Sequence, residues 1–189
     1  MKILCFGDSN TYGYDPRSYF GSRYPAQYRW VDLLAQTLGC KVVNAGENGR
    51  EIPRREEELL HFDRMLTDQQ PIDLLIVMLG SNDLLQGNSI ESVVKRMENF
   101  LQHVDLGKFQ VLLISPPPMQ PGEWVPTQDL IDHSVALNCE YQALSGRLGV
   151  RFADAGEWNI SLTFDGVHFT EEGHRAFAEG LAKYLNKGE

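Results

Sequence analysis

The sequence predicts an α/β fold in which helices cover both faces of a five-stranded parallel sheet. Three observations support this prediction. Five short apolar runs alternate with longer segments of helical periodicity, which is the pattern of repeated βαβ units. The run at 72–79 is apolar at nearly every position, as a central strand buried on both faces should be. The chain has 189 residues, 42% of them hydrophobic, so we expect one domain spanning residues 1–189.

The five predicted strands follow the apolar runs, which lie at 2–6, 41–44, 72–79, 110–115 and 150–152. We expect the three-layer, flavodoxin-like arrangement, in which the strands of the sheet take the order 2-1-3-4-5.

Helices are predicted where apolar residues recur at helical spacing. One such stripe comprises Ile90, Val93, Val94, Met97, Leu101 and Val104, and another comprises Phe177, Leu181 and Leu185. A third helix carries Leu59, Leu60, Met65 and Leu66 after the charged segment 54–58, whose side we expect to face solvent. The segment 116–126 is too rich in proline for a regular element and too apolar for a spacer, so we expect a loop over a binding site.

The composition limits the partners of the chain. A formal net charge of −9 and a pI near 5.0 disfavour nucleic acid and anionic membranes, and they indicate a small, neutral substrate. No run of about 18 apolar residues suggests a membrane span, and the first residues are too short an apolar stretch for a signal peptide. Cys5, Cys40 and Cys139 lack metal-like spacing and are expected to be reduced thiols, which indicates a cytoplasmic protein.

Chemically capable residues follow the predicted strands. Ser9 comes after the first run, Gly46 after the second and Asn82 after the third. Asp165 and His168 lie in the segment before the last predicted helix. Because ligands of open α/β sheets bind at the carboxyl ends of the strands, we expect these residues to meet at one edge.

These residue types are those of nucleophilic acyl transfer. A serine hydroxyl needs a base to take its proton, and the base needs a third group to orient it. We predict that Ser9 attacks an acyl carbon, that His168 takes its proton and that Asp165 holds the other ring nitrogen of His168. For the oxyanion, the candidate donors are the backbone N–H groups of Ser9 and Gly46 and the side-chain amide of Asn82. Gly46 is expected to allow a close approach and unusual dihedral angles.

Four sequence blocks together resemble the SGNH hydrolase family, also called the GDSL esterases and lipases. They are Gly7-Asp8-Ser9, Asn44-Ala45-Gly46, Gly80-Ser81-Asn82-Asp83 and Asp165-Gly166-Val167-His168. The blocks occur in the family's order across nearly the whole chain, although Asn10 stands where the name-giving motif has leucine. The resemblance implies a serine carboxylic ester hydrolase without a cofactor.

Within that family, the chain resembles the bacterial arylesterase and acyltransferase branch through Tyr12-Gly13-Tyr14, Arg29-Trp30, 77–83, 115–118 and 165–170. The resemblance implies cleavage of short acyl esters, with acetyl esters as the leading substrates, and it is compatible with a homo-oligomer. Glu47 and Asn48 replace the leucine and serine common in the branch, which would put a carboxylate close to the oxyanion site. Tyr12, Glu47, Asn48 and Trp124 are the predicted substrate contacts.

Other residues have simpler interpretations. Asp8 is too close to Ser9 to act as the third group of the triad and is expected to hold the nucleophile turn. Asp83 is interpreted as structural, and Trp30 and Trp158 as core residues. His61, His103, His133 and His174 lie on predicted helices among charged residues, so we expect them to be solvated, and we predict no metal site.

Several functions use the same residues. A carbohydrate acetyl esterase, a thioesterase and a lysophospholipase remain alternatives to a general short-chain esterase. A non-catalytic binding module on this scaffold is disfavoured because every catalytic position is filled. Nucleotide or flavin binding lacks support because the chain has neither a G-x-G-x-x-G nor a Walker lysine motif, and the absence of a G-x-S-x-G elbow disfavours the α/β-hydrolase fold.

Overall fold

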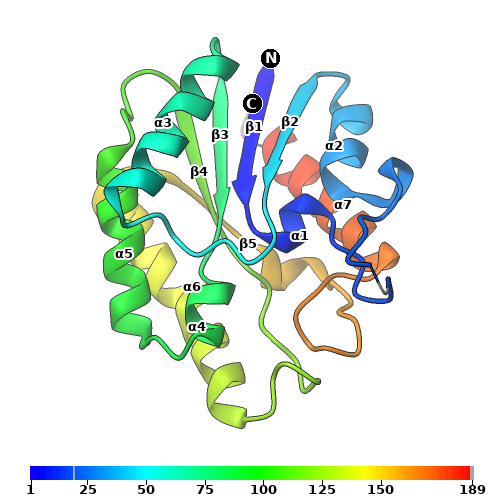
Figure 1. Cartoon of the computed structure of the whole chain (residues 1–189). Helices are drawn as coiled ribbons and strands as arrows, with labels where there is room; N and C mark the ends of the chain where they lie inside the picture. Colours follow the sequence, from blue (N-terminus) through cyan, green and yellow to red (C-terminus); the bar gives the residue numbers. More distant parts are fainter. Residues whose placement is uncertain (19, 188–189) are drawn as a thin grey trace.

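The computed structural model describes residues 1–18 and 20–187, and it contains the predicted five-stranded sheet (Figure 1). All strand pairs are parallel, in the order β2-β1-β3-β4-β5. The strands are β1 (Lys2–Gly7), β2 (Lys41–Gly46), β3 (Leu74–Met78), β4 (Gln110–Ser115) and β5 (Arg151–Asp154). The predicted strand order and the central position of the third run are therefore confirmed.

Helices connect the strands and cover both faces of the sheet. They are α1 (Ser9–Tyr12), α2 (Trp30–Leu38), α3 (Glu56–Gln69), α4 (Ser81–Leu85), α5 (Ile90–His103), α6 (Gln128–Leu148) and α7 (Glu171–Asn186), with short 3₁₀ helices η1 (Ala26–Tyr28) and η2 (Ala155–Trp158). In Figure 1, α3, α5 and α6 lie on one side of the sheet, and α2 and α7 lie on the other.

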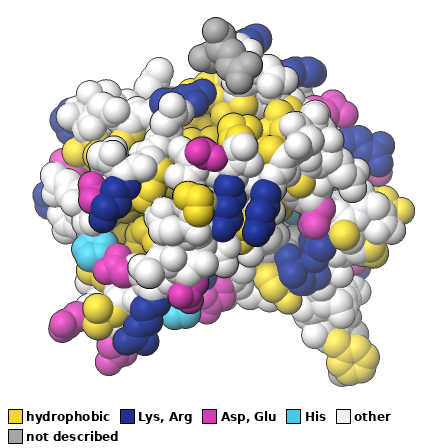
Figure 2. Space-filling view, turned by 90° about the horizontal axis from the view of Figure 1, so that it is seen from above, with side chains coloured by type: hydrophobic (Ala, Val, Ile, Leu, Met, Phe, Trp, Pro, Cys, Tyr) yellow, Lys and Arg dark blue, Asp and Glu magenta, His cyan; other side chains and the backbone are white. Residues whose placement is uncertain are grey.

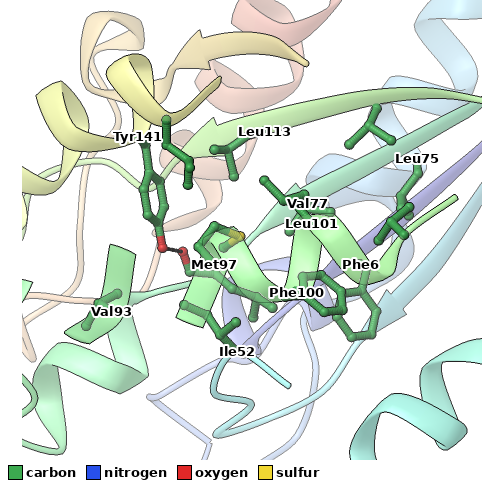
Figure 3. Packing of buried hydrophobic residues seen from close by; sticks show 14 of the residues in the cluster. Phe6, Ile52, Leu75, Val77, Val93, Met97, Phe100, Leu101, Leu113 and Tyr141 are labelled. Carbon is green, nitrogen blue, oxygen red and sulfur yellow. Dashed lines mark hydrogen bonds between the residues drawn. The ribbon is translucent and has the colours of Figure 1, made fainter. Parts of the chain in front are cut away.

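Each face of the sheet has its own hydrophobic cluster, and β3 contributes to both. Its residues Leu75 and Val77 join the cluster under α3, α5 and α6, whereas Leu74, Ile76 and Met78 join the cluster under α2 and α7. All five side chains are buried, because successive strand residues point to opposite faces and helices cover both. Figure 3 shows part of the first cluster, with Phe6, Phe100 and Met97 packed beside one another.

The third predicted helix is present, but its buried face differs from the prediction. Phe62 is fully buried and contacts the rings of Phe6 and Phe100 at centroid distances of 4.9 and 4.8 Å. Leu59 and Leu66 pack beside it, whereas Leu60 is exposed. The reason is helical spacing: residues 59, 62 and 66 share one stripe, and residue 60 lies about 100° away from residue 59.

Three strands, β1, β2 and β5, extend beyond their apolar runs toward the carboxyl end. In the ladder between β1 and β2, Phe6 pairs with Ala45 and Gly7 with Gly46. Backbone pairing, rather than side-chain hydrophobicity, ends these strands, so the sequence pattern placed their ends one or two residues early. As a result, Gly46 is the last residue of β2 and lies directly beside the end of β1.

The amino ends of the strands form the face shown in Figure 2, where Lys and Arg side chains are interspersed with Asp and Glu. A hollow of about 810 Å³ lies at this edge, lined by Ile72, Phe109 and Val150 among others. No residue of the four sequence blocks lines this hollow. Within residues 1–18 and 20–187, no helix is both long and apolar enough to cross a membrane.

Candidate active site

Ser9 is the first residue of α1, at the carboxyl end of β1. The Asp8 side chain caps this helix by accepting a 3.0 Å hydrogen bond from the Asn10 N–H, which is the turn-holding role that the sequence indicated. Burial raises the pKa of Asp8 to about 6, although the Asn10 amide opposes the rise. The helix ends after one turn at Gly13, which adopts a φ of 89°. Ser9 is therefore fixed on a short, tightly held turn.

The structure brings Ser9, His168 and Asp165 together as the sequence predicted. The Ser9 Oγ lies 2.9 Å from the His168 Nε2, and the His168 Nδ1 lies 2.7 Å from the Asp165 Oδ2. Because an ionised carboxylate can only accept, Nδ1 carries the proton, and Nε2 is left to accept from the Ser9 hydroxyl. All three side chains are buried, so these bonds lie in a site of low polarity.

Asp165 is held in its ionised form. Burial alone would raise its pKa, but the His168 ring and the backbone N–H groups of His168 and Val167 all donate to it, and the pKa falls to about 2. The two backbone bonds are each 2.9 Å long and reach Oδ1, while Oδ2 serves the His168 ring. The D-x-x-H spacing thus folds into one turn that fixes the carboxylate, the ring and the tautomer together.

The proline-rich segment 116–126 lies against this turn. Three of its backbone N–H groups donate to the Asp165 turn: Gln120 to the Gly166 carbonyl at 3.0 Å, Glu123 to the Phe164 carbonyl at 3.2 Å and Trp124 to the Asp165 carbonyl at 3.1 Å. A Cβ at Gly122 would lie only 2.3 Å from the Asp165 carbonyl carbon, so the two backbones are in direct contact.

Two aromatic rings contact the His168 ring. The Tyr14 ring is 4.7 Å away and tilted, and the Trp124 ring is 4.9 Å away in an edge contact. Trp124 is 45% exposed, so its ring borders both His168 and solvent. Trp124 thus lies beside His168, whereas Trp30 is buried and Trp158 packs on Phe177, as core residues do.

Two of the three candidate oxyanion donors already make bonds. The Gly46 N–H donates to the Asn44 side-chain oxygen at 2.9 Å, and the Asn82 amide donates to the Arg50 carbonyl at 3.0 Å. An amide group has two hydrogens, so Asn82 keeps one for a ligand, whereas Gly46 has to share or exchange its single hydrogen. A Cβ at Gly46 would lie 2.1 Å from the Tyr12 N, so the expected close approach of the backbone is present. The φ angle of Gly46 is not positive, so the expected unusual dihedral angles are absent at this residue.

Arg50 links the ends of the first two strands, which sequence reasoning did not foresee. Its guanidinium donates to the Gly7 carbonyl at 2.7 Å and to the Ala45 carbonyl, and it lies over the Phe6 ring at 4.2 Å. It also forms a 2.6 Å ion pair with Glu47. Burial lowers the pKa of Arg50 while Glu47 opposes the change. The Glu47 carboxylate is thus not a free charge beside the site: it is 64% exposed and paired.

The remaining predicted substrate contacts are less defined. Tyr12 is half-buried, and its ring carries the Arg23 guanidinium at 4.2 Å. Asn48 is exposed at the turn after β2. Asp83 is fully buried, accepts from the Ile52 N–H and pairs with Arg96 at 2.9 Å, in line with its structural interpretation.

The prediction for His174 is wrong. His61, His103 and His133 are exposed or partly exposed, but His174 is fully buried beside the rings of Tyr24 and Phe169. Burial lowers its pKa to about 3, so it is neutral. His174 shares the buried face of α7 with Phe177 and Leu181, whereas the adjacent Arg175 is exposed. Among the described residues, no group of three or more His, Cys, Asp or Glu could hold a metal ion.

Known proteins resemble this chain both in sequence and in structure. Residues 5–176 match the GDSL-like lipase/acylhydrolase family. A solved structure of a proposed arylesterase from Agrobacterium tumefaciens is 30% identical over 98% of both chains, with a TM-score of 0.87. A carbohydrate acetylesterase from Sinorhizobium meliloti is 25% identical over 100% of this chain and 99% of its own, with a TM-score of 0.85. An aryl esterase from M. smegmatis is 29% identical over 98% of both chains, with a TM-score of 0.81. No curated protein matches the chain significantly in sequence.

Proposed function

This chain belongs to the GDSL-like lipase/acylhydrolase family and is a carboxylic ester hydrolase, and we propose that it cleaves short-chain acyl esters, chiefly acetyl esters, through an acyl-Ser9 intermediate. The observation that carries the proposal is the chain of two hydrogen bonds from Ser9 Oγ to His168 to Asp165, at 2.9 and 2.7 Å. This is the arrangement that activates a serine hydroxyl.

In the proposed reaction, the Ser9 oxygen attacks the acyl carbon while His168 Nε2 takes the hydroxyl proton. Asp165 stabilises the resulting imidazolium, and His168 then gives the proton to the leaving alcohol. Water enters, loses a proton to His168 and attacks the acyl-Ser9 ester, which releases the acid and restores the serine. The low pKa of Asp165 supports this role, because the carboxylate stays ionised throughout.

The developing oxyanion needs donors that are in place beforehand. We assign this function to the backbone N–H groups of Ser9 and Gly46 and to the second hydrogen of the Asn82 amide. Asn44 accepts from Gly46, so the proposed hole forms fully when the oxyanion competes for that hydrogen. Removing one such donor typically raises the barrier by about 3 to 4 kcal/mol.

A small, neutral ester fits the surroundings of Ser9. The net charge of −9 disfavours anionic substrates, and the exposed Trp124 ring offers an apolar surface beside His168 for the leaving group. An acetylated carbohydrate is the second candidate, because an exposed aromatic ring also suits the apolar face of a sugar. The descriptions of the similar structures, aryl esterase and carbohydrate acetylesterase, support both.

The proposal is tested by Ser9→Ala. We expect turnover of a chromogenic acetate ester to fall to background while the circular dichroism spectrum is unchanged. A matched control is Ser145→Ala, since Ser145 is also buried but lies on α6. Labelling with a fluorophosphonate and peptide mapping should place the adduct on Ser9. Turnover by Ser9→Ala at the parent rate, or an adduct on another residue, would reject the nucleophile.

A series of aryl esters with increasing acyl length tests the substrate class. We expect kcat/KM to be highest for acetyl and to fall for long chains. A maximum at long acyl chains would exclude the short-chain assignment and favour the lysophospholipase or thioesterase alternatives. Release of acetate from acetylated xylose oligomers faster than from aryl acetate would favour the carbohydrate candidate.

A further inference from the structure

Asn10 occupies the position after Ser9 where the family's name-giving motif has leucine. The residue is only 5% exposed, so its polar side chain requires hydrogen-bonding partners. The partners it has come from the opposite end of the chain and flank His168.

The Asn10 carboxamide pairs with the backbone on both sides of His168. Its Nδ2 donates to the Val167 carbonyl at 3.1 Å, and its Oδ1 accepts from the Phe169 N–H at 2.9 Å. These bonds join residues 157 and 159 positions apart in sequence. Leucine has a similar size but could make neither bond.

Asn10 is itself held in place. Its backbone N–H donates to the capping Asp8 side chain, and its carbonyl accepts from the Trp30 indole N–H at 2.9 Å. Because Ser9 and Asn10 are adjacent on α1, a fixed Asn10 transmits the position of the serine turn directly to the histidine segment.

Residues 167–169 have six backbone N–H and C=O groups, and Asn10 is the hydrogen-bond partner of two of them. The other four have their own partners: the Val167 and His168 N–H groups donate to Asp165, the His168 carbonyl accepts from the Thr163 N–H, and the Phe169 carbonyl accepts from the Tyr24 hydroxyl. Asp165 and Thr163 belong to the same turn as His168, so they cannot fix that turn relative to Ser9. Asn10 supplies the two bonds that come from the nucleophile segment.

We propose that Asn10 is a positioning residue that holds the His168 ring against the Ser9 hydroxyl, an inference that rests on the proposed function. In Asn10→Leu, the histidine segment keeps its internal bonds but loses its register with α1. The Ser9 to His168 bond then lengthens or is populated only part of the time. Since misplacement of a reacting group by about 1 Å costs roughly 10²-fold in rate, a partial loss of register should lower kcat by about 10- to 100-fold.

The experiment measures kcat and KM for a chromogenic acetate ester, together with the rate of fluorophosphonate labelling. We expect Asn10→Leu to lower kcat and the labelling rate in parallel, with KM changed less than about twofold, because ground-state binding does not use this bond. In the parent, a downfield proton signal from His168 Nδ1–H should be visible by NMR, and it should weaken or shift in Asn10→Leu.

Tyr184→Phe is the matched control. It also removes one side-chain hydrogen bond to a backbone carbonyl, that of Phe152 at 2.6 Å, but between α7 and β5. It should lower thermal stability and leave kcat, KM and the labelling rate unchanged. A residue with a merely structural role would behave in this way, so the contrast separates positioning from stability.

The result that overturns the inference is an Asn10→Leu enzyme with kcat and labelling rate within twofold of the parent, or with a change in KM alone. Should Asn10→Leu fail to fold, Asn10→Asp takes its place. The aspartate keeps the oxygen that accepts from the Phe169 N–H and removes only the donor to the Val167 carbonyl. A kcat of Asn10→Asp within twofold of the parent again overturns the inference. Ser9→Ala distinguishes the two failures: if it stays active, the proposed function falls, whereas if it is inactive and Asn10→Leu is not impaired, only the role of Asn10 falls.

Discussion

Replacing Gly122 by alanine should impair catalysis from a distance, through the turn that carries Asp165. Gly122 lies in the loop at 116–126, and the Cβ of an alanine there would lie 2.3 Å from the Asp165 carbonyl carbon and 2.4 Å from the Gly166 nitrogen. Both obstacles are backbone atoms, so no side-chain rotation can relieve the contact. The added methyl group therefore has to push the two backbones apart.

The size of the effect follows from these distances. Ordinary contacts of a Cβ begin near 3.4 Å, so the backbones must separate by about 1 Å. The bond from Asp165 Oδ2 to His168 Nδ1 is 2.7 Å long, and a shift of that size would break it unless His168 follows. A displacement of about 1 Å at a reacting group costs roughly 10²-fold in rate. We expect kcat of Gly122→Ala to fall by about two orders of magnitude, with a much smaller change in KM.

Steady-state kinetics on a chromogenic acetate ester measures the effect, and Gly146→Ala provides the control. Gly146 lies within α6 with no atom near the position of an added Cβ, so alanine there should leave kcat unchanged and raise the unfolding free energy by about 0.5 to 1 kcal/mol. If kcat of Gly122→Ala stays within threefold of the parent, the loop yields instead of the Asp165 turn, and the reasoning from backbone contact is refuted.

Three further changes have defined outcomes. Arg50→Met removes the guanidinium bonds to the Gly7 and Ala45 carbonyls, so it should lower kcat about 10-fold and the unfolding free energy by about 2 kcal/mol in urea titrations. An unchanged urea midpoint and an unchanged kcat would show that these bonds are dispensable. Asp165→Asn should lower kcat by about 10⁴-fold at neutral pH, since an amide favours the wrong His168 tautomer, and activity near that of the parent would exclude Asp165 as the orienting group. The folded-state pKa of His174, about 3, lies below its ordinary value of 6.5, so the unfolded chain binds the proton first as the pH falls. The contribution of neutral His174 to stability is therefore complete above pH 6.5 and is lost as the pH falls toward 3. Between pH 7 and pH 5, the unfolding free energy of the parent should fall by roughly 2 kcal/mol more than that of His174→Phe, and equal losses in the two proteins would contradict this.

Much of the fold could be predicted because its causes are local. The five apolar runs and their intervening helices follow directly from side-chain periodicity, and a parallel sheet restricts the ways in which they can connect. The meeting of Ser9, Asp165 and His168 was predictable for a related reason: residues at the carboxyl ends of parallel strands converge, and the D-x-x-H spacing closes within one turn.

The interactions that hold the site together could not be predicted, because they depend on which backbone groups face each other after folding. Asn10 and Arg50 bond to carbonyls and N–H groups that every residue possesses, so nothing in the sequence identifies their partners. The burial of His174 has a different cause. Its charged neighbours suggested solvent, but helical spacing puts His174 on the same buried face of α7 as Phe177 and Leu181.

The separation of Ser9 and His168 by 159 positions also bears on how the enzyme is made. During synthesis, the segment with Ser9 leaves the ribosome long before His168 is made. A nascent chain that lacks His168 should therefore be catalytically silent, and esterase activity in a translation reaction should begin only after the segment with His168 has emerged.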